Sequence, residues 1–141
     1  MSHSRLAIVQ RAPTYLHRDQ TLRTAVAAIA EAAAGGAKLV IFPEAFIPGY
    51  PAWIWRLRPG TDGAVGSRLH ALLLEQAVSL KRGDLAPLSE AARAHHVTIV
   101  CGVNERDDEF GGGTLYNTVV IIGPDGAILN RHRKLMPTNP E

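Results

Sequence analysis

The sequence contains a single cysteine, Cys101, among its 141 residues. One thiol cannot form an intrachain disulfide, which excludes a disulfide-stabilised scaffold and indicates a reducing compartment. Long apolar runs are lacking too, because no stretch approaches the roughly 20 apolar residues that a membrane span needs. The first residues also lack the apolar region of a signal peptide. We therefore expect a cytoplasmic protein that makes no membrane contact.

An excess of charge of one sign is also lacking. The 15 Lys and Arg residues nearly balance the 13 Asp and Glu residues, and the net charge is +2 with histidine neutral. So small a net charge does not favour a nucleic-acid partner. The 6 histidines and the one cysteine show no metal-ligand spacing, so no metal or other cofactor is expected.

Glycine motifs that bind nucleotides are missing. The first expected strand, residues 6–9, is followed by Arg-Ala-Pro at residues 11–13 rather than by Gly-x-Gly-x-x-Gly. The three glycines at 111–113 are not followed by Lys and Ser or Thr, so we expect a turn there and not a phosphate-binding loop.

Strand-like and helix-like segments alternate along the chain. Residues 6–9 and 39–42 are apolar runs typical of buried strands, and helical spacing between them predicts two parallel neighbouring strands. Asp19 and Asp84 are expected to cap the helices that follow them. The chain is thus predicted to be one layered α/β domain. The remaining expected elements are helices at 67–80 and 85–95, strands at 98–103, 114–122 and 127–130, and a polar turn at 104–113.

A carboxylate stands at the end of the second expected strand. Pro43 follows the apolar run, lacks a backbone donor and ends the pairing, and Glu44 comes next. Ligands of α/β proteins bind outside the carboxyl ends of the strands. Glu44 is therefore a candidate functional carboxylate, and the alternative is a strand-end side chain that points to solvent.

Residues 47–66 form a long irregular stretch that contains both tryptophans of the sequence. Such loops in compact domains usually carry function or an interaction. Tyr50 and Trp53 are candidates for lining a substrate pocket or making a subunit contact. The alternative is that the aromatic side chains fill the core beneath the loop.

A basic run, Arg-His-Arg-Lys at residues 131–134, follows the last expected strand. Such a run is usually a solvated face, and a nucleic-acid patch is the usual functional alternative. The apolar residues 135–137 come next, so Lys134 is expected against apolar material, where an ammonium group needs a carboxylate partner. Glu44 and Glu141 are the two candidate partners.

Taken together, these stretches resemble the nitrilase (carbon–nitrogen hydrolase) superfamily, and within it the true nitrilases. The resemblance extends over nearly the whole chain, from about Leu6 to Glu141. The segments that carry it are Phe-Pro-Glu-Ala-Phe at 42–46, Gly-Tyr-Pro at 49–51, Cys-Gly-Val-Asn-Glu-Arg at 101–106, Leu-Tyr-Asn-Thr at 115–118 and Arg-His-Arg-Lys-Leu-Met-Pro-Thr at 131–138.

The resemblance implies a four-layer α-β-β-α sandwich, with residues 1–141 as the N-terminal portion of a single domain. It also implies a Glu-Lys-Glu-Cys catalytic set and hydrolysis of an organic nitrile through thioimidate and thioester intermediates. Carried over by position, Glu44 is the general base, Lys134 stabilises the charge that develops on the substrate, and Glu141 orients Lys134. The implied partners are a small-molecule nitrile and further copies of the chain, as a dimer or a spiral filament.

The superfamily's nucleophilic cysteine lies beyond the second glutamate, and the sequence ends at that glutamate, Glu141. Cys101 is not a substitute, because thiols within buried apolar strands are mostly inert. We therefore expect the chain to be the N-terminal segment of a longer nitrilase and to be inactive by itself. The alternatives are an amidase or carbamoylase of the same superfamily, and a non-catalytic segment that assembles with partner chains.

Overall fold

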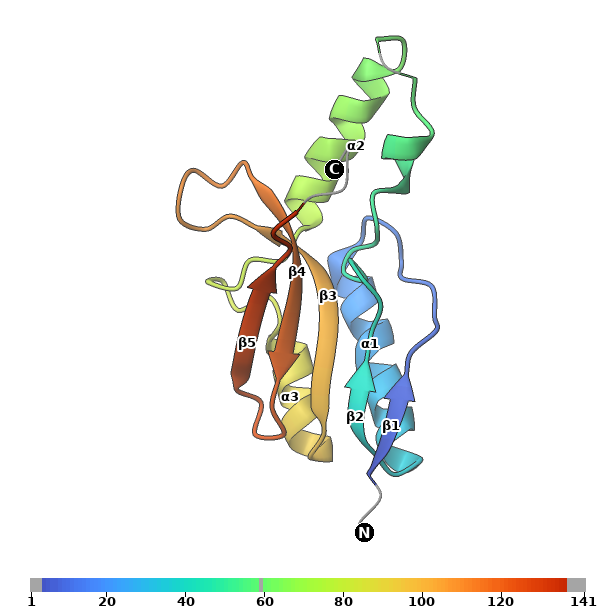
Figure 1. Cartoon of the computed structure of the whole chain (residues 1–141), viewed down its shortest axis with the longest axis vertical. Helices are drawn as coiled ribbons and strands as arrows, with labels where there is room; N and C mark the ends of the chain where they lie inside the picture. The colour runs from blue at the N-terminus through green and yellow to red at the C-terminus, as the bar shows by residue number, and fades with distance from the viewer. Residues whose placement is uncertain (1–3, 59, 137–141) are drawn as a thin grey trace.

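The computed structural model describes residues 4–58 and 60–136. No helix within these ranges is long and apolar enough to cross a membrane. In chain order the elements are β1 (Arg5–Ile8), α1 (Arg18–Ala34), β2 (Ala37–Ile41), the 3-10 helix η1 (Ala52–Trp55), α2 (Gly63–Gln76), α3 (Ala86–His95), β3 (Thr98–Arg106), β4 (Leu115–Ile122) and β5 (Ile128–Arg133) (Figure 1).

The strands form one sheet in the order β1-β2-β3-β4-β5. β1, β2 and β3 pair in parallel, whereas β3, β4 and β5 pair antiparallel. The predicted parallel neighbours on either side of the first helix are thereby confirmed. Figure 1 shows α1 and α3 on the same side of the sheet, with α2 extending beyond its end. The expected α/β class is confirmed, and this sheet and its helices supply two layers.

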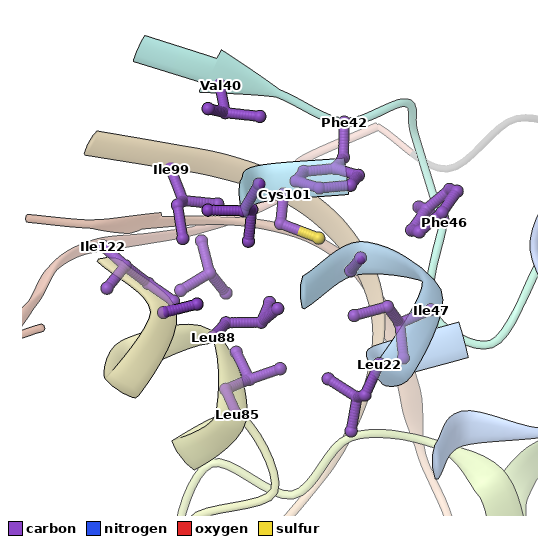
Figure 2. Packing of buried hydrophobic residues seen from close by; sticks show 14 of the residues in the cluster. Leu22, Val40, Phe42, Phe46, Ile47, Leu85, Leu88, Ile99, Cys101 and Ile122 are labelled. Atoms are coloured by element: carbon purple, nitrogen blue, oxygen red, sulfur yellow. The ribbon is translucent and has the colours of Figure 1, made fainter. Parts of the chain in front are cut away.

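The hydrophobic core lies between the sheet and helices α1 and α3. Val40, Ile99 and Ile122 are register partners across β2, β3 and β4, and all three are fully buried. Leu88 from α3 packs beside this row, and Leu22 from α1 packs nearer Ile47 in the same core, as Figure 2 shows. Each such side chain contributes about 1.5–3 kcal/mol by leaving water, so this face of the sheet fixes the register of the strands.

The opposite face of the sheet is apolar but open. Ile8, Ile41, Val100 and Ile121 form the row next to the buried one, and each of them retains solvent exposure, which reaches 74% for Ile8. Exposed apolar rows of this kind mark surfaces that pack against other protein.

The helix caps differ from the expectation. α1 begins after His17 and α3 after Leu85, and neither has a side-chain cap. The Asp19 carboxylate instead accepts from Arg18. Asp84 accepts from the Ser79 backbone at 2.8 Å and from Arg18 Nη1 at 3.2 Å. Both predicted caps are wrong, because Asp19 is the second residue inside α1 and the Asp84 carboxylate is occupied by Ser79, Arg82 and Arg18. The bond between Arg18 and Asp84 joins α1 to the segment before α3.

β3 and β5 are longer than expected, continuing through Arg106 and Arg133. The extended ends of the two strands are joined through Glu105, whose side chain is 1% exposed and accepts from Arg133 Nη2 at 2.6 Å and Thr118 Oγ1 at 2.8 Å. Arg131 also approaches it, at 3.5 Å. These hydrogen bonds raise the pKa of the Arg133 guanidinium. Arg131 and Arg133 of the basic run therefore pair with the buried Glu105, while Arg131 and His132 remain exposed to solvent.

Candidate active site

Glu44 lies on a short excursion of the chain between two attachments to β3. The Phe42 nitrogen donates to Val100 at 2.8 Å, and the Ile47 nitrogen donates to Gly102 at 3.3 Å. Between these bonds the chain leaves the ladder after Pro43, and Ala45 adopts a left-handed conformation with φ of 47°. The strand pairing thus resumes at Ile47, and it fixes both ends of the segment that carries the carboxylate.

Gly102 makes this excursion possible. A Cβ atom at this position would lie 2.4 Å from the Pro43 carbonyl oxygen, 2.7 Å from the Ala45 nitrogen and 2.7 Å from Glu44 Cα. Real Cβ atoms do not approach backbone this closely, so only glycine fits. Sequence reasoning assigned no role to Gly102, although a glycine inside an apolar strand is a known sign of close backbone approach.

The structure brings Glu44 and Lys134 together across ninety positions of sequence. Glu44 Oε1 and Lys134 Nζ are 3.4 Å apart, and the two side chains are 55% and 33% exposed. Glu44 therefore does not simply point to solvent. The apolar surroundings expected around Lys134 are not supplied by its successors, because Leu135 and Met136 are largely exposed. Glu141, the other candidate partner, lies outside the described residues.

Asn117 on β4 completes this cluster, and sequence reasoning gave it no role. Its Nδ2 donates to Glu44 Oε1 at 2.6 Å, and its backbone oxygen accepts from the Lys134 nitrogen at 2.8 Å. The available signals were its place in the Leu-Tyr-Asn-Thr segment at 115–118 and its polar side chain in a mainly apolar strand. The second signal is weak, because polar residues also occur on strand faces that meet water.

A cavity of about 690 Å³ adjoins the cluster, with Tyr50, Trp53, Asn117 and Lys134 among its lining residues. Neither aromatic side chain is fully buried, so they do not fill the core beneath the loop. The ring of Trp53 packs edge-on against that of Tyr15, with 5.9 Å between centroids. Within residues 4–58 and 60–136, no group of three or more His, Cys, Asp or Glu residues could hold a metal ion.

Cys101 faces away from this cluster. Its side chain is 0% exposed and lies in the core beneath the helices, near Phe42 in Figure 2. Burial raises the pKa of the thiol to about 12. The neighbouring Gly102 lies against the Glu44 segment, and alternation along a strand sends the Cys101 side chain to the other face. The expectation that Cys101 is an inert core residue therefore agrees with its position.

Cys101 is expected to resist thiol-specific reagents in the folded chain. A thiol with a pKa near 12 is ionised in only about one molecule in 10,000 at pH 8, and the core blocks access. Modification should be followed by absorbance for the 141-residue polypeptide, first folded and then in denaturant, with Cys101→Ala as the blank. One thiol should react only in denaturant. Rapid modification of the folded chain would contradict this assignment.

Comparison with known proteins adds the following findings. The sequence profile of the carbon-nitrogen hydrolase family matches residues 5–141. The chain is 40% identical over 138 residues to an aliphatic nitrilase of Rhodococcus rhodochrous, and the match covers 97% of this chain and 36% of that protein. It is 36% identical over 141 residues to an arylacetonitrilase of Aspergillus niger, covering 100% of this chain and 40% of that protein.

A plant relative and a solved structure extend the comparison. Nitrilase 1 of Arabidopsis thaliana is 38% identical over 138 residues, covering 97% of this chain and 39% of that protein. An amidase structure from Nesterenkonia sp. superposes with a TM-score of 0.69 at 23% identity, covering 99% of this chain and 45% of that one. The chain thus spans less than half the length of each of these relatives.

Proposed function

The chain belongs to the carbon–nitrogen hydrolase family, and on that basis we propose that it forms the N-terminal portion of a single nitrilase domain. The whole protein would hydrolyse an organic nitrile to a carboxylic acid and ammonia. One observation carries the proposal: Glu44 and Lys134, from two motifs far apart in sequence, meet at 3.4 Å beside a cavity. The nitrilase names of relatives at 36–40% identity support a nitrile as the substrate.

The residue types suit this chemistry. A carboxylate at Glu44 accepts the proton of an incoming thiol, so that the thiolate attacks the nitrile carbon and the proton passes to the nitrogen, giving a thioimidate. Water then releases ammonia and leaves a thioester, and a second water releases the acid. Lys134 has a compact ammonium that donates to the charge developing on the substrate. Glu141 would orient Lys134.

The nucleophile in this proposal is a cysteine that follows Glu141 in a longer polypeptide. Cys101 cannot take this role, since its thiol is buried in the core with a pKa of about 12. The open apolar row that includes Ile8 and Val100 supports a missing half, because further sheet would bury it. Assembly into homo-oligomers is part of the same proposal.

A second candidate is hydrolysis of an amide or carbamoyl group. It uses the same base, ammonium and thiol, but begins from a carbonyl, so loss of ammonia from the tetrahedral intermediate leaves a thioester from an amide or a thiocarbamate from a carbamoyl group, which water then hydrolyses. Because the fold is similar to that of an amidase, the assay below includes amides as well as nitriles. The two candidates differ only in the electrophile that the cavity admits.

The deciding experiment combines a measurement of the intact mass of the protein with an assay of ammonia release. The protein is purified from its natural source, its denaturing intact mass is measured, and ammonia release is followed with aliphatic nitriles, aryl nitriles and the matching amides. We expect a mass well above 15.2 kDa and ammonia from a nitrile. Release from amides alone would support the second candidate. A mass of 15.2 kDa with no ammonia release would contradict both and leave a non-catalytic segment.

A further inference from the structure

Asn117 contacts both members of the candidate catalytic pair. Its side-chain amide donates to Glu44 Oε1 at 2.6 Å, and its backbone oxygen accepts from the Lys134 nitrogen at 2.8 Å. An ionised carboxylate only accepts hydrogen bonds, so the amide must present its nitrogen and not its oxygen to Glu44. Asn117 is therefore the donor and Glu44 the acceptor in this hydrogen bond.

We propose that Asn117 is the positioning residue of the site, setting the orientation of the Glu44 carboxylate and the place at which Lys134 leaves β5. This inference rests on the proposed function, because it assigns Glu44 the role of base. Although Asn117 lines the cavity, the proposal gives it no contact with the reacting atoms of the substrate or the nucleophile. Asn117 acts through the two residues that have such contacts.

The geometry around the Glu44 carboxylate explains why a positioning residue is needed. The side chain is 55% exposed, and its contact with Lys134, at 3.4 Å, is long for a hydrogen bond between charged groups. The 2.6 Å bond from Asn117 is the tighter restraint. In the part of the chain that the structure describes, both donors approach Oε1, which leaves Oε2 turned to neither of them. Oε2 is then the oxygen available to take a proton.

The strand register makes Asn117 a rigid support. It pairs with Asn104 of β3, whose backbone nitrogen donates to Ile47 and whose side chain donates to the Gly49 oxygen at 3.0 Å. The partner of Asn117 thus holds the far end of the excursion that carries Glu44. Both contacts of Asn117 start from the same residue of β4, so the Glu44 carboxylate and the backbone from which the Lys134 side chain departs keep a fixed relation.

A neutral amide also suits this position better than a charged donor would. A cation placed at this distance would stabilise the carboxylate further and weaken it as a base, whereas a hydroxyl would be too short to reach from the same backbone. Asparagine donates a hydrogen bond without adding a charge. The positive charge at the site is then left to Lys134, where the substrate develops negative charge.

The test uses the complete polypeptide and the variants Asn117→Leu and Asn117→Ala. Leucine has nearly the shape of asparagine but no donor, so it separates lost shape from the lost hydrogen bond. We expect kcat to fall about 10- to 100-fold with either variant, as for a bond to a charged group, with KM within about twofold. Asn130→Ala, an exposed asparagine on β5, is the matched control and should keep the wild-type kcat. A wild-type kcat for Asn117→Leu would overturn the inference.

A double-mutant cycle of thermal stability tests the contact between Asn117 and Glu44 without relying on the proposed function. Melting temperatures are measured for Asn117→Ala, Glu44→Ala and the double variant. Non-additive changes are expected, because removing Glu44 already removes the contact, and additive changes would overturn the inference. Failure of the wild-type polypeptide to release ammonia from any nitrile or amide would overturn the proposed function and the catalytic part of this inference, while the cycle still reports on the contact.

Discussion

Replacing Glu44 with glutamine is expected to lower kcat for nitrile hydrolysis about 1,000-fold, within the range that general acid–base catalysis supplies. Glutamine keeps the length of the side chain and an oxygen that accepts from Asn117 and Lys134, so the surroundings of the cavity are retained. What is lost is the ability to take the thiol proton. The measurement is ammonia release by the complete polypeptide at saturating nitrile.

The matched control for this substitution is Glu90→Gln. Glu90 is exposed on α3, on the face of the sheet opposite to the open one, and the same chemical change there should leave kcat at the wild-type value. Melting temperatures of both variants should stay near that of the wild type. If Glu44→Gln kept kcat within about threefold of the wild type, Glu44 would not be the base.

Replacing Gly102 with valine is expected to lower the free energy of unfolding by about 3 kcal/mol, the upper end of ordinary overpacking costs. A Cβ at this position would stand 2.4 Å from the Pro43 oxygen and 2.7 Å from Glu44 Cα. These atoms belong to the backbone and cannot rotate away, so the excursion must move off β3. Urea unfolding followed by circular dichroism measures the cost, and ammonia release should fall even where the fold persists.

Gly63→Ala provides the control for Gly102→Val. Gly63 is the first residue of α2, and a Cβ there would meet nothing within 4 Å. Alanine favours a helix over glycine, so this variant should be neutral or more stable by up to about 1 kcal/mol. Similar urea midpoints for the two glycine variants would show that close packing beneath Glu44 is not what Gly102 provides.

The parts of the site that follow from local sequence were predictable. A buried apolar run that ends at proline places Glu44 at the carboxyl end of a strand, and the need of an ammonium for a carboxylate makes it one of two candidate partners of Lys134, with Glu141 as the other. The parallel arrangement of the first strands follows from the helix between them. These inferences required only the neighbouring residues or the order of elements.

The predictions that were wrong, and the residues that sequence reasoning missed, depend on partners that are distant in sequence. The carboxylate of Asp84 has the chemistry of a cap, but Arg18 approaches it from α1 instead. Asn117 and Gly102 acquire their roles from the register of β3 against β4 and from the return of the chain at Ile47. Hydrophobic periodicity indicates that a strand exists and which face is buried, but not which residue lies opposite.

The excursion that carries Glu44 is fastened to β3 at Phe42 and again at Ile47, whereas the aromatic wall of the cavity begins only afterwards, at Tyr50. The two walls are therefore mechanically separate. We therefore expect substitutions at Tyr50, Trp53 and Ile54 to change the lining of the cavity more than the position of the Glu44 carboxylate. Under the proposed function, changes in this one loop would alter the range of substrates while the hydrogen bonds that fasten Glu44 to β3 stay as they are.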